Sequence, residues 1–448
     1  MKAPPEQSHP ALEAAIQACL DGGATAADGR MSVSEGVNVA VLGGKLESIE
    51  RAESQALALR CFFGQRMAHV SGSDLSKAGL AALSERCVAM AKVAPEDPHA
   101  GLAPSDGLET QLRELDLDGD VDVPDEDLER RALEAEAAAC AVAGVKQVSS
   151  CGIGWSRSTR WLMSSQGFQS GKTASSLGLG LAAVAEADGK MERDYESRTA
   201  RYLEDMPAPE TIGRIAGERT VARLSPRKLA TQKAAVIYDR RLSASLVGSL
   251  LGAISGPSIA RGVSFLKDKL GEAVFRSDVN IVDQPFRLRG MGSRAHDGEG
   301  RPVRERAIIE NGVLTEWLLN GPSARQLGLE PNGYASLGFG DPPGVSPSNV
   351  VVEAGQQSPK AMMAEVQKGL LVTDMFGPSI NPNTGDYSVG VSGFWFEGGQ
   401  IAYPVAEVTI AGDLPSMFAR LVPASDLELR GSRDAPSLLI EDMSIAGD

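Results

Sequence analysis

The chain has 448 residues, of which 42% are apolar, and a formal net charge of −15 at pH 7. At about 150 residues per domain the length predicts two to three domains, and the apolar fraction is enough for ordinary globular cores. The negative charge would repel a phosphate backbone, and no Lys/Arg-rich stripe with interleaved aromatic residues counters that repulsion, so we expect no direct nucleic-acid partner.

Signals for membrane insertion and secretion are missing from the pattern. No apolar run approaches the ~18 to 20 residues that span a bilayer, and residues 1–10 carry prolines and a glutamate where a signal peptide needs an apolar core. The five cysteines are scattered and include no C-x-x-C pair, which argues against a disulfide framework and a zinc knuckle. These features predict a cytoplasmic protein with no membrane contact and with reduced, mostly buried thiols.

The first 94 residues predict a compact unit of helices and strands. Apolar residues recur at helical spacing over 12–20, ahead of Gly22-Gly23, and again over 80–90. Between these two helices, three stretches have the alternation or apolar content of strands: 31–41, 56–63 and 67–70. We therefore expect a helix-strand-helix unit over residues 1–94.

Residues 95–124 differ from their surroundings in composition. They are rich in Pro, Asp and Glu, a composition that does not bury a core, and they predict a linker or surface excursion. An acidic metal-binding loop is the alternative for this segment. A helix follows over 125–142, because Ala, Leu and Glu are strong helix formers.

A hairpin is the clearest element of the next unit. Residues 177–187 and 190–198 flank Asp188-Gly189, a pair that readily adopts the positive φ angles of a two-residue turn. A helix is expected over 211–224. Together these elements predict a second α+β unit over residues 125–227.

The remaining chain, residues 228–448, predicts a sheet-rich C-terminal domain. A buried strand at 234–238 is followed by an apolar segment of small residues at 242–254, and the pairs Asn311-Gly312 and Gly398-Gly399 mark two hairpins. The whole chain therefore predicts an α+β fold, with helix and antiparallel-strand units first and a sheet-rich domain last.

The sequence holds no recognisable set of metal ligands. The four histidines stand alone, at His9, His69, His99 and His296, so no H-E-x-x-H pair can hold zinc from one helix face. After Cys151 there is no further cysteine and only one histidine, which leaves the C-terminal half without soft or borderline ligands. An all-carboxylate site for magnesium or calcium is the alternative, with no motif behind it. We expect no metal-binding and no catalytic residue in this chain.

Three other patterns carry little chemistry. Residues 167–173 resemble a phosphate-binding loop, but the motif is one residue short and runs into alternating leucines instead of a helix. No G-x-S-x-G elbow is present, and a serine triad would have to recruit one of the scattered histidines. Glu192, Asp194 and Glu196 alternate along a strand and predict a solvated acidic stripe, with an acid–base pair as the alternative.

Two stretches carry a family resemblance. The first is Met-Glu-Arg-Asp-Tyr at 191–195, and the second is a long block that includes Gly-Leu-Leu-Val-Thr-Asp at 369–374, Asn-Pro-Asn-Thr-Gly-Asp-Tyr at 381–387 and Tyr-Pro-Val-Ala-Glu-Val-Thr-Ile-Ala-Gly at 403–412. On these motifs the chain resembles the PmbA/TldE branch of the TldD/PmbA metallopeptidase family, also called modulator of DNA gyrase. The resemblance covers nearly the whole chain.

The resemblance implies a two-protein peptidase. In this family a TldD-type subunit has an H-E-x-x-x-H helix and a later cysteine as zinc ligands, and it pairs with a PmbA/TldE-type subunit of the same fold. The segment that corresponds to this helix, residues 245–251, contains no histidine or glutamate. The resemblance therefore implies no cofactor in this chain, zinc in a TldD-type partner, and joint cleavage or trimming of unfolded or extended peptides.

Seven residues within the resembling motifs are candidates for contact with the peptide or the partner: Arg193, Asp194, Tyr195, Asn381, Thr384, Asp386 and Tyr387. An extended peptide suits a sheet-rich domain, because it can add a strand to an exposed sheet edge through main-chain hydrogen bonds. The alternative for each residue is a role in turns and packing, since Thr384-Gly385-Asp386 has the chemistry of a tight turn.

Two other functions stay open at this point. The chain could be a homodimeric peptide-binding or regulatory module without hydrolase activity. It could also be an autonomous hydrolase that uses carboxylates alone, although no constellation in the sequence supports this.

Overall fold

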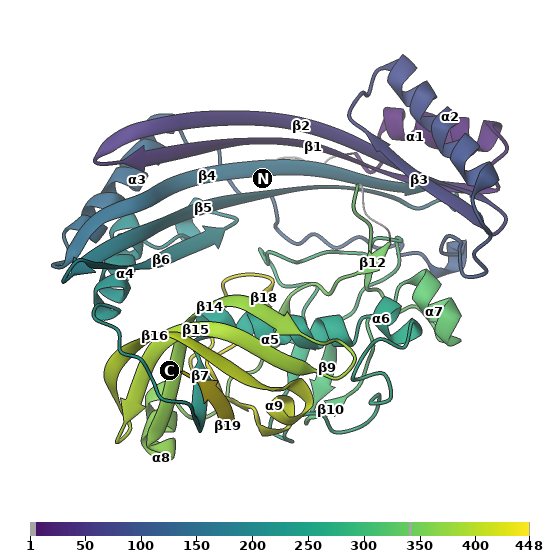
Figure 1. The fold of residues 1–448 in the computed structure, drawn as a ribbon. Helices are drawn as coiled ribbons and strands as arrows, with labels where there is room; N and C mark the ends of the chain where they lie inside the picture. The colour runs from purple at the N-terminus through teal and green to yellow at the C-terminus, as the bar shows by residue number, and fades with distance from the viewer. Residues whose placement is uncertain (1–5, 340–342, 448) are drawn as a thin grey trace.

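The computed structural model describes residues 6–339 and 343–447. Residues 1–5, which belong to the opening stretch used above to argue against a signal peptide, lie outside this range. The predicted α+β architecture is confirmed: helices and antiparallel strands come first and a sheet-rich lobe follows (Figure 1). Within the described residues, no helix has both the length and the apolar content needed to cross a bilayer.

The N-terminal lobe is built on one antiparallel sheet of six strands, in the order β3-β2-β1-β4-β5-β6. The strands are β1 (Ala26–Leu42), β2 (Lys45–Phe63), β3 (Arg66–Gly72), β4 (Val145–Ser164), β5 (Gln169–Ala187) and β6 (Lys190–Ala200). The pairing of β1 with β4 joins the strands of the two units expected at 1–94 and 125–227 into this single sheet. The predicted turn at Asp188-Gly189 is confirmed, with φ of 52° and 72°.

The two faces of this sheet differ, because successive side chains of a strand point to opposite faces. Odd-numbered residues of the central strands, such as Met31, Val39 and Leu177, pack under helices, and we call this the outer face. Helices α1 (Pro10–Asp21) and α2 (Lys77–Val93) cover one end of it, and α3 (Asp125–Cys140) and α4 (Pro209–Ala222) cover the other (Figure 1). The even-numbered inner face contacts the C-terminal lobe.

The connection from α2 to α3 is more buried than its composition suggested. It contains the short 3₁₀ helix η1 (Ser105–Gly107), and Leu115, Leu117 and Val121 are buried. Its main chain bonds to both lobes, because the Leu117 carbonyl accepts from the Ser175 N–H (2.9 Å) and the Leu115 carbonyl accepts from the Arg289 N–H (3.0 Å). The strict alternation of apolar residues with aspartates from 115 to 123 is the signal of a half-buried extended segment.

The C-terminal lobe contains a small barrel. Its sheet has the order β16-β15-β14-β7-β19-β17, and a further pairing of β16 with β19 closes the ring. The strands are β7 (Gln232–Tyr238), β14 (Lys368–Ile380), β15 (Asp386–Glu397), β16 (Gln400–Asp413), β17 (Val422–Pro423) and β19 (Leu438–Ala446). Tyr238, Trp395 and Ile440 belong to the buried core of this lobe. The predicted hairpin at Gly398-Gly399 is confirmed as the β15–β16 turn.

A second, five-stranded sheet and several short helices complete this lobe. The sheet has the order β10 (Val313–Leu314), β9 (Arg306–Glu310), β8 (Ile281–Asp283), β13 (Val350–Val352) and β18 (Arg433–Asp434), and it confirms the hairpin at Asn311-Gly312. β11 (Ala335–Ser336) pairs with β12 (Gly344–Val345). The helices are η2 (Leu203–Asp205), which precedes the lobe, α5 (Arg240–Ala253), α6 (Gly256–Ala260), α7 (Gly321–Leu327), α8 (Pro359–Val366) and α9 (Leu414–Arg420).

Buried carboxylates of β6 link the two lobes. Glu196 is 2% exposed and pairs with Arg198 and Arg219 of the N-terminal lobe and with Arg430 of the C-terminal lobe, the last at 3.3 Å. The predicted solvated stripe is therefore wrong for Asp194 and Glu196. The reason is that α4 and the C-terminal lobe lie over this face of the edge strand and supply arginines in place of water.

The Glu196 cluster predicts a large loss of stability in the Glu196→Gln variant. The amide cannot balance three guanidinium groups, and removal of one partner of a buried ion pair costs about 3–5 kcal/mol. Glu218→Gln is the matched control, because Glu218 is exposed and pairs with Arg214 one helical turn away. An exposed ion pair of this kind contributes roughly 0.3–0.5 kcal/mol to the free energy of unfolding. Urea unfolding of both variants checks the difference, and equal losses would contradict the linking role of Glu196.

Candidate functional site

Helix α5 occupies the position that the family resemblance assigns to the metal-binding helix. Leu246, Val247 and Leu250 point into the core, whereas the other side carries Ser245 and Gly252. No group of three or more His, Cys, Asp or Glu side chains suited to a metal ion occurs among residues 6–339 and 343–447. The side chains of this helix therefore do not fit a zinc ion.

The motif at 193–195 lies where β6 meets the C-terminal lobe. Asp194 is 3% exposed and accepts hydrogen bonds from Arg241 of α5 (2.9 Å) and from Arg223 (3.5 Å). The guanidinium of Arg241 also lies 5.6 Å from the centre of the Tyr195 ring, and the side chains of Tyr195 and Arg193 are exposed. Asp194 therefore fixes the position of α5 against β6, and its burial favours the packing role over direct contact with a peptide.

The motif at 381–387 forms the turn between β14 and β15. Asn381 accepts the Gly385 N–H through its carbonyl, and the Thr384 hydroxyl donates to the Asp386 carboxylate at 2.6 Å. Asn381, Thr384 and Asp386 are exposed, whereas Tyr387 is buried with its hydroxyl 3.4 Å from that of Tyr238. The structure thus places Tyr387 in the barrel core, which favours packing, and leaves the other three at the surface.

The strand that leads into this turn has an open edge. β14 pairs with β15 as far as Ile380, but with β7 only from Gly369 to Val372. Beyond Val372 the other edge of β14 has no strand partner among the described residues. Phe376 and Ile380 are 51% and 39% exposed along it. An exposed edge with apolar side chains is the usual template for an added strand, although Pro378 lacks one of the N–H donors.

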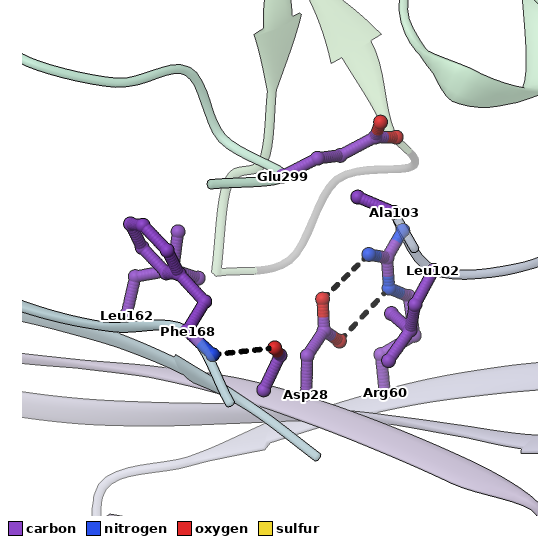
Figure 2. A pocket seen from close by; sticks show the side chains of 8 residues that line it. Asp28, Arg60, Leu102, Ala103, Leu162, Phe168 and Glu299 are labelled. Atoms are coloured by element: carbon purple, nitrogen blue, oxygen red, sulfur yellow. Dashed lines mark hydrogen bonds and ion pairs between the residues drawn. The ribbon is translucent and has the colours of Figure 1, made fainter. Parts of the chain in front are cut away.

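A buried ion pair marks the other end of the contact between the lobes. Asp28 of β1 and Arg60 of β2 lie opposite each other, and Arg60 donates to both carboxylate oxygens, at 2.9 and 2.5 Å (Figure 2). Phe168 and Glu299 also line this pocket, whose free space of about 10 Å³ is room for a single water molecule. The pocket is too small for an organic substrate, and we assign it a structural role.

A serine and a histidine meet between the lobes, a pairing that the sequence did not single out. His296 Nε2 lies 2.7 Å from Ser170 Oγ of β5, and its Nδ1 lies 2.7 Å from the Asp297 carbonyl. Nδ1 donates to that carbonyl, so Nε2 accepts from the serine. Burial, and then the charge of Lys172, lower the pKa of His296 to about 4, so the ring is neutral at pH 7 and a weak base. The Ser170–His296 hydrogen bond attaches the loop that contains His296 in the C-terminal lobe to the N-terminal sheet.

Lys172 lies two residues after Ser170 on β5, so its side chain is on the same face of the sheet. Both side chains lie on the inner face of β5, where Lys172 is opposite Arg160 of β4. As predicted, the phosphate-loop-like stretch at 167–173 runs into a strand and not into a helix. Lys172 is therefore a side chain of the inner face and not the lysine of a nucleotide site.

Comparisons with known proteins agree along the whole chain. Three family models match in sequence: PmbA/TldA metallopeptidase domain 1 at residues 27–91, the central domain at 119–224 and the C-terminal domain at 231–447. The single N-terminal sheet combines β1, β2 and β3 from the first of these domains with β4, β5 and β6 from the central one.

Full-length relatives of this chain are named metalloprotease PmbA or a homolog of it. Metalloprotease PmbA of Escherichia coli O157:H7 is 35% identical over 442 residues, which cover 97% of this chain and 96% of the relative. A Metalloprotease PmbA homolog of Haemophilus influenzae is 31% identical over 452 residues, which cover 100% of this chain and 98% of the relative.

Solved structures share the fold. A candidate modulator of DNA gyrase from Bacteroides thetaiotaomicron superposes with a TM-score of 0.91 at 23% identity and covers 99% of this chain and 100% of its own. TldE from Thermococcus kodakarensis superposes with a TM-score of 0.85 at 19% identity and covers 98% and 100%. From the three matching domain models and the full-length relatives, we conclude that this chain belongs to the PmbA/TldD metallopeptidase family.

Proposed function

We propose that this chain is the metal-free subunit of a two-protein peptidase. It pairs with a zinc-bearing TldD-type subunit in the cytoplasm, and together they degrade or trim unfolded or extended peptides. On its own the chain does not hydrolyse peptide bonds.

The observation that carries this proposal is the composition of α5. The family fold is complete, yet the exposed side of the helix carries Ser245, Ser249 and Gly252 where a metal site needs imidazole and carboxylate groups. A subunit that keeps the fold without these donors supports a role in shaping access to a site in another chain. The name metalloprotease, which its relatives carry, then describes the assembled pair.

The open edge of β14 supports a role in holding the peptide. The pairing with β7 ends at Val372, and the Thr373 carbonyl accepts from Arg241, so the edge open to an added strand begins after Thr373. The exposed side chains of Phe376 and Ile380 offer apolar contacts there. Recognition through main-chain groups depends little on sequence, and it requires an unfolded substrate because a folded chain has already used its own groups.

The first test compares the chain alone with the chain co-expressed with a TldD-type protein. We expect zinc and cleavage of an unfolded peptide only in the mixture, because α5 lacks ligands. Elemental analysis and a peptide-cleavage assay give both quantities, and addition of a chelator should abolish the activity of the mixture.

Two results would contradict the proposal. Zinc-dependent cleavage by the isolated chain would show that it holds its own metal. A stable homodimer that binds peptide and does not associate with any TldD-type protein would favour a binding or regulatory module.

The β14 edge predicts a second effect. In the assembled complex, Phe376→Ser and Ile380→Ser should each raise KM for an unfolded peptide about three- to tenfold with little change in Tm, because these side chains are already exposed. Ile401→Ser is the matched control, since Ile401 is 45% exposed on another strand, β16. Steady-state kinetics measure KM, and sedimentation of the complex checks that the two subunits remain paired. An unchanged KM in both β14 variants would rule this edge out.

A further inference from the structure

Two like charges face each other on the inner face of the N-terminal sheet. Arg160 of β4 and Lys172 of β5 are directly opposite in the register. A third cation, Arg30 of β1, lies next to them, because Arg160 is also opposite Ser32, two residues along β1 from Arg30. Like charges directly opposite each other destabilise a sheet, so an uncompensated cluster of this kind has to be explained.

No ion pair joins Arg160, Lys172 or Arg30 to a carboxylate among residues 6–339 and 343–447. Asp28, two residues along β1, raises the pKa of Arg30 by its charge, but both of its oxygens accept from Arg60. Arg160 makes one side-chain hydrogen bond, to the Ser158 hydroxyl at 3.4 Å, and Nε of Arg30 is buried without a hydrogen-bond partner. Nearby arginines of the same sheet differ, since Arg60 pairs with Asp28 and Arg157 pairs with Asp118 at 2.8 Å. Arg60 and Arg157 thus each have a carboxylate partner in an ion pair, whereas Arg160, Lys172 and Arg30 form none within the described residues.

Burial and neighbouring positive charges destabilise the ionised forms of Lys172 and Arg30. Burial, and then the charges of Arg160, Arg294 and Arg201, lower the pKa of Lys172 to about 8. Burial likewise lowers the pKa of Arg30 to about 10. An anion placed between these groups would offset both effects, because an opposite charge favours the ionised form of a base.

The floor around the cluster is polar and built of small side chains. The hydroxyls of Ser32, Ser34 and Ser158 hydrogen-bond to one another at 2.9 to 3.3 Å. Arg160 is exposed and Lys172 is half-buried, so the cluster is open to a ligand on the inner face.

We propose that Arg160, Lys172 and Arg30 form a carboxylate-binding site, which holds the C-terminal carboxylate or an acidic side chain of an extended peptide on the inner face. A guanidinium offers a carboxylate two parallel N–H donors, and a lysine adds a point charge. The net charge of −15 disfavours polyanions such as nucleic acid, whereas a peptide with one carboxylate meets little repulsion. This inference rests on the proposed function, since it names the group by which the chain holds the peptide.

The test measures the binding of short labelled peptides to the full chain by fluorescence anisotropy. Three peptides share one neutral sequence and differ in one group: a free C-terminal carboxylate, a C-terminal amide, and an amide with one internal glutamate. We expect tighter binding of a carboxylate peptide than of the plain amide, by about tenfold. The tighter of the two carboxylate peptides identifies the source of the group.

Substitutions then locate the site. Lys172→Gln and Arg160→Gln should each remove most of the carboxylate preference and leave amide binding unchanged, whereas Lys172→Arg should keep it. Lys190→Gln is the matched control, because it removes one positive charge at the exposed β5–β6 turn of the same sheet. Lys172→Gln should also keep or raise Tm, since it removes the repulsion with Arg160; a purely structural lysine would give a lower Tm.

The outcomes separate the two proposals. If no peptide binds to the chain or to its complex, the peptide-holding function fails, and this inference fails with it. If all three peptides bind equally well, the function stands and the carboxylate site is overturned. Equal loss of carboxylate preference in Lys172→Gln and Lys190→Gln would also overturn it, because the effect would then come from net charge.

Discussion

A sheet of long strands has two faces to cover, and this constraint decides the architecture. The four N-terminal helices cover only the outer face, at its two ends, and the inner face meets the C-terminal lobe (Figure 1). Charge and hydrogen bonding join the lobes at several points: Glu196 with Arg430, Asp194 with Arg241, and Ser170 with His296. A contact of this kind fixes orientation without a continuous apolar core, and polar side chains such as those of Ser34 and Arg160 remain on the inner face.

The same contact relates the fold to the family's chemistry. Asp194 of the sheet holds Arg241, which stands in the first turn of α5. The helix to which the family resemblance assigns the metal site is thus held at a defined position, and its exposed side is made of small residues.

The sequence predicted those elements whose conformation depends on residues close together in the chain. Turns such as Asp188-Gly189 and the four N-terminal helices follow from local chemistry, because a few residues determine them. The single N-terminal sheet could not be predicted, since Asp28 pairs with Ser164 across more than a hundred residues of chain. For the same reason the burial of Glu196 was missed: alternation shows which side chains share a face but not what covers that face. The motif at 381–387 was found by resemblance, and only the fold separates buried Tyr387 from its exposed neighbours.

The strand order also has a consequence for synthesis on the ribosome. The edge of β1 that pairs with β4 stays open until residues 145–164 have been made, because β2 and β3 occupy only the other side. At ordinary elongation rates of about 5–20 residues per second, the ~100 residues between these strands leave that edge unpaired for roughly 5–20 s. Glu35 places a charge on that open strand, and charge on an exposed strand disfavours pairing with a neighbouring nascent chain.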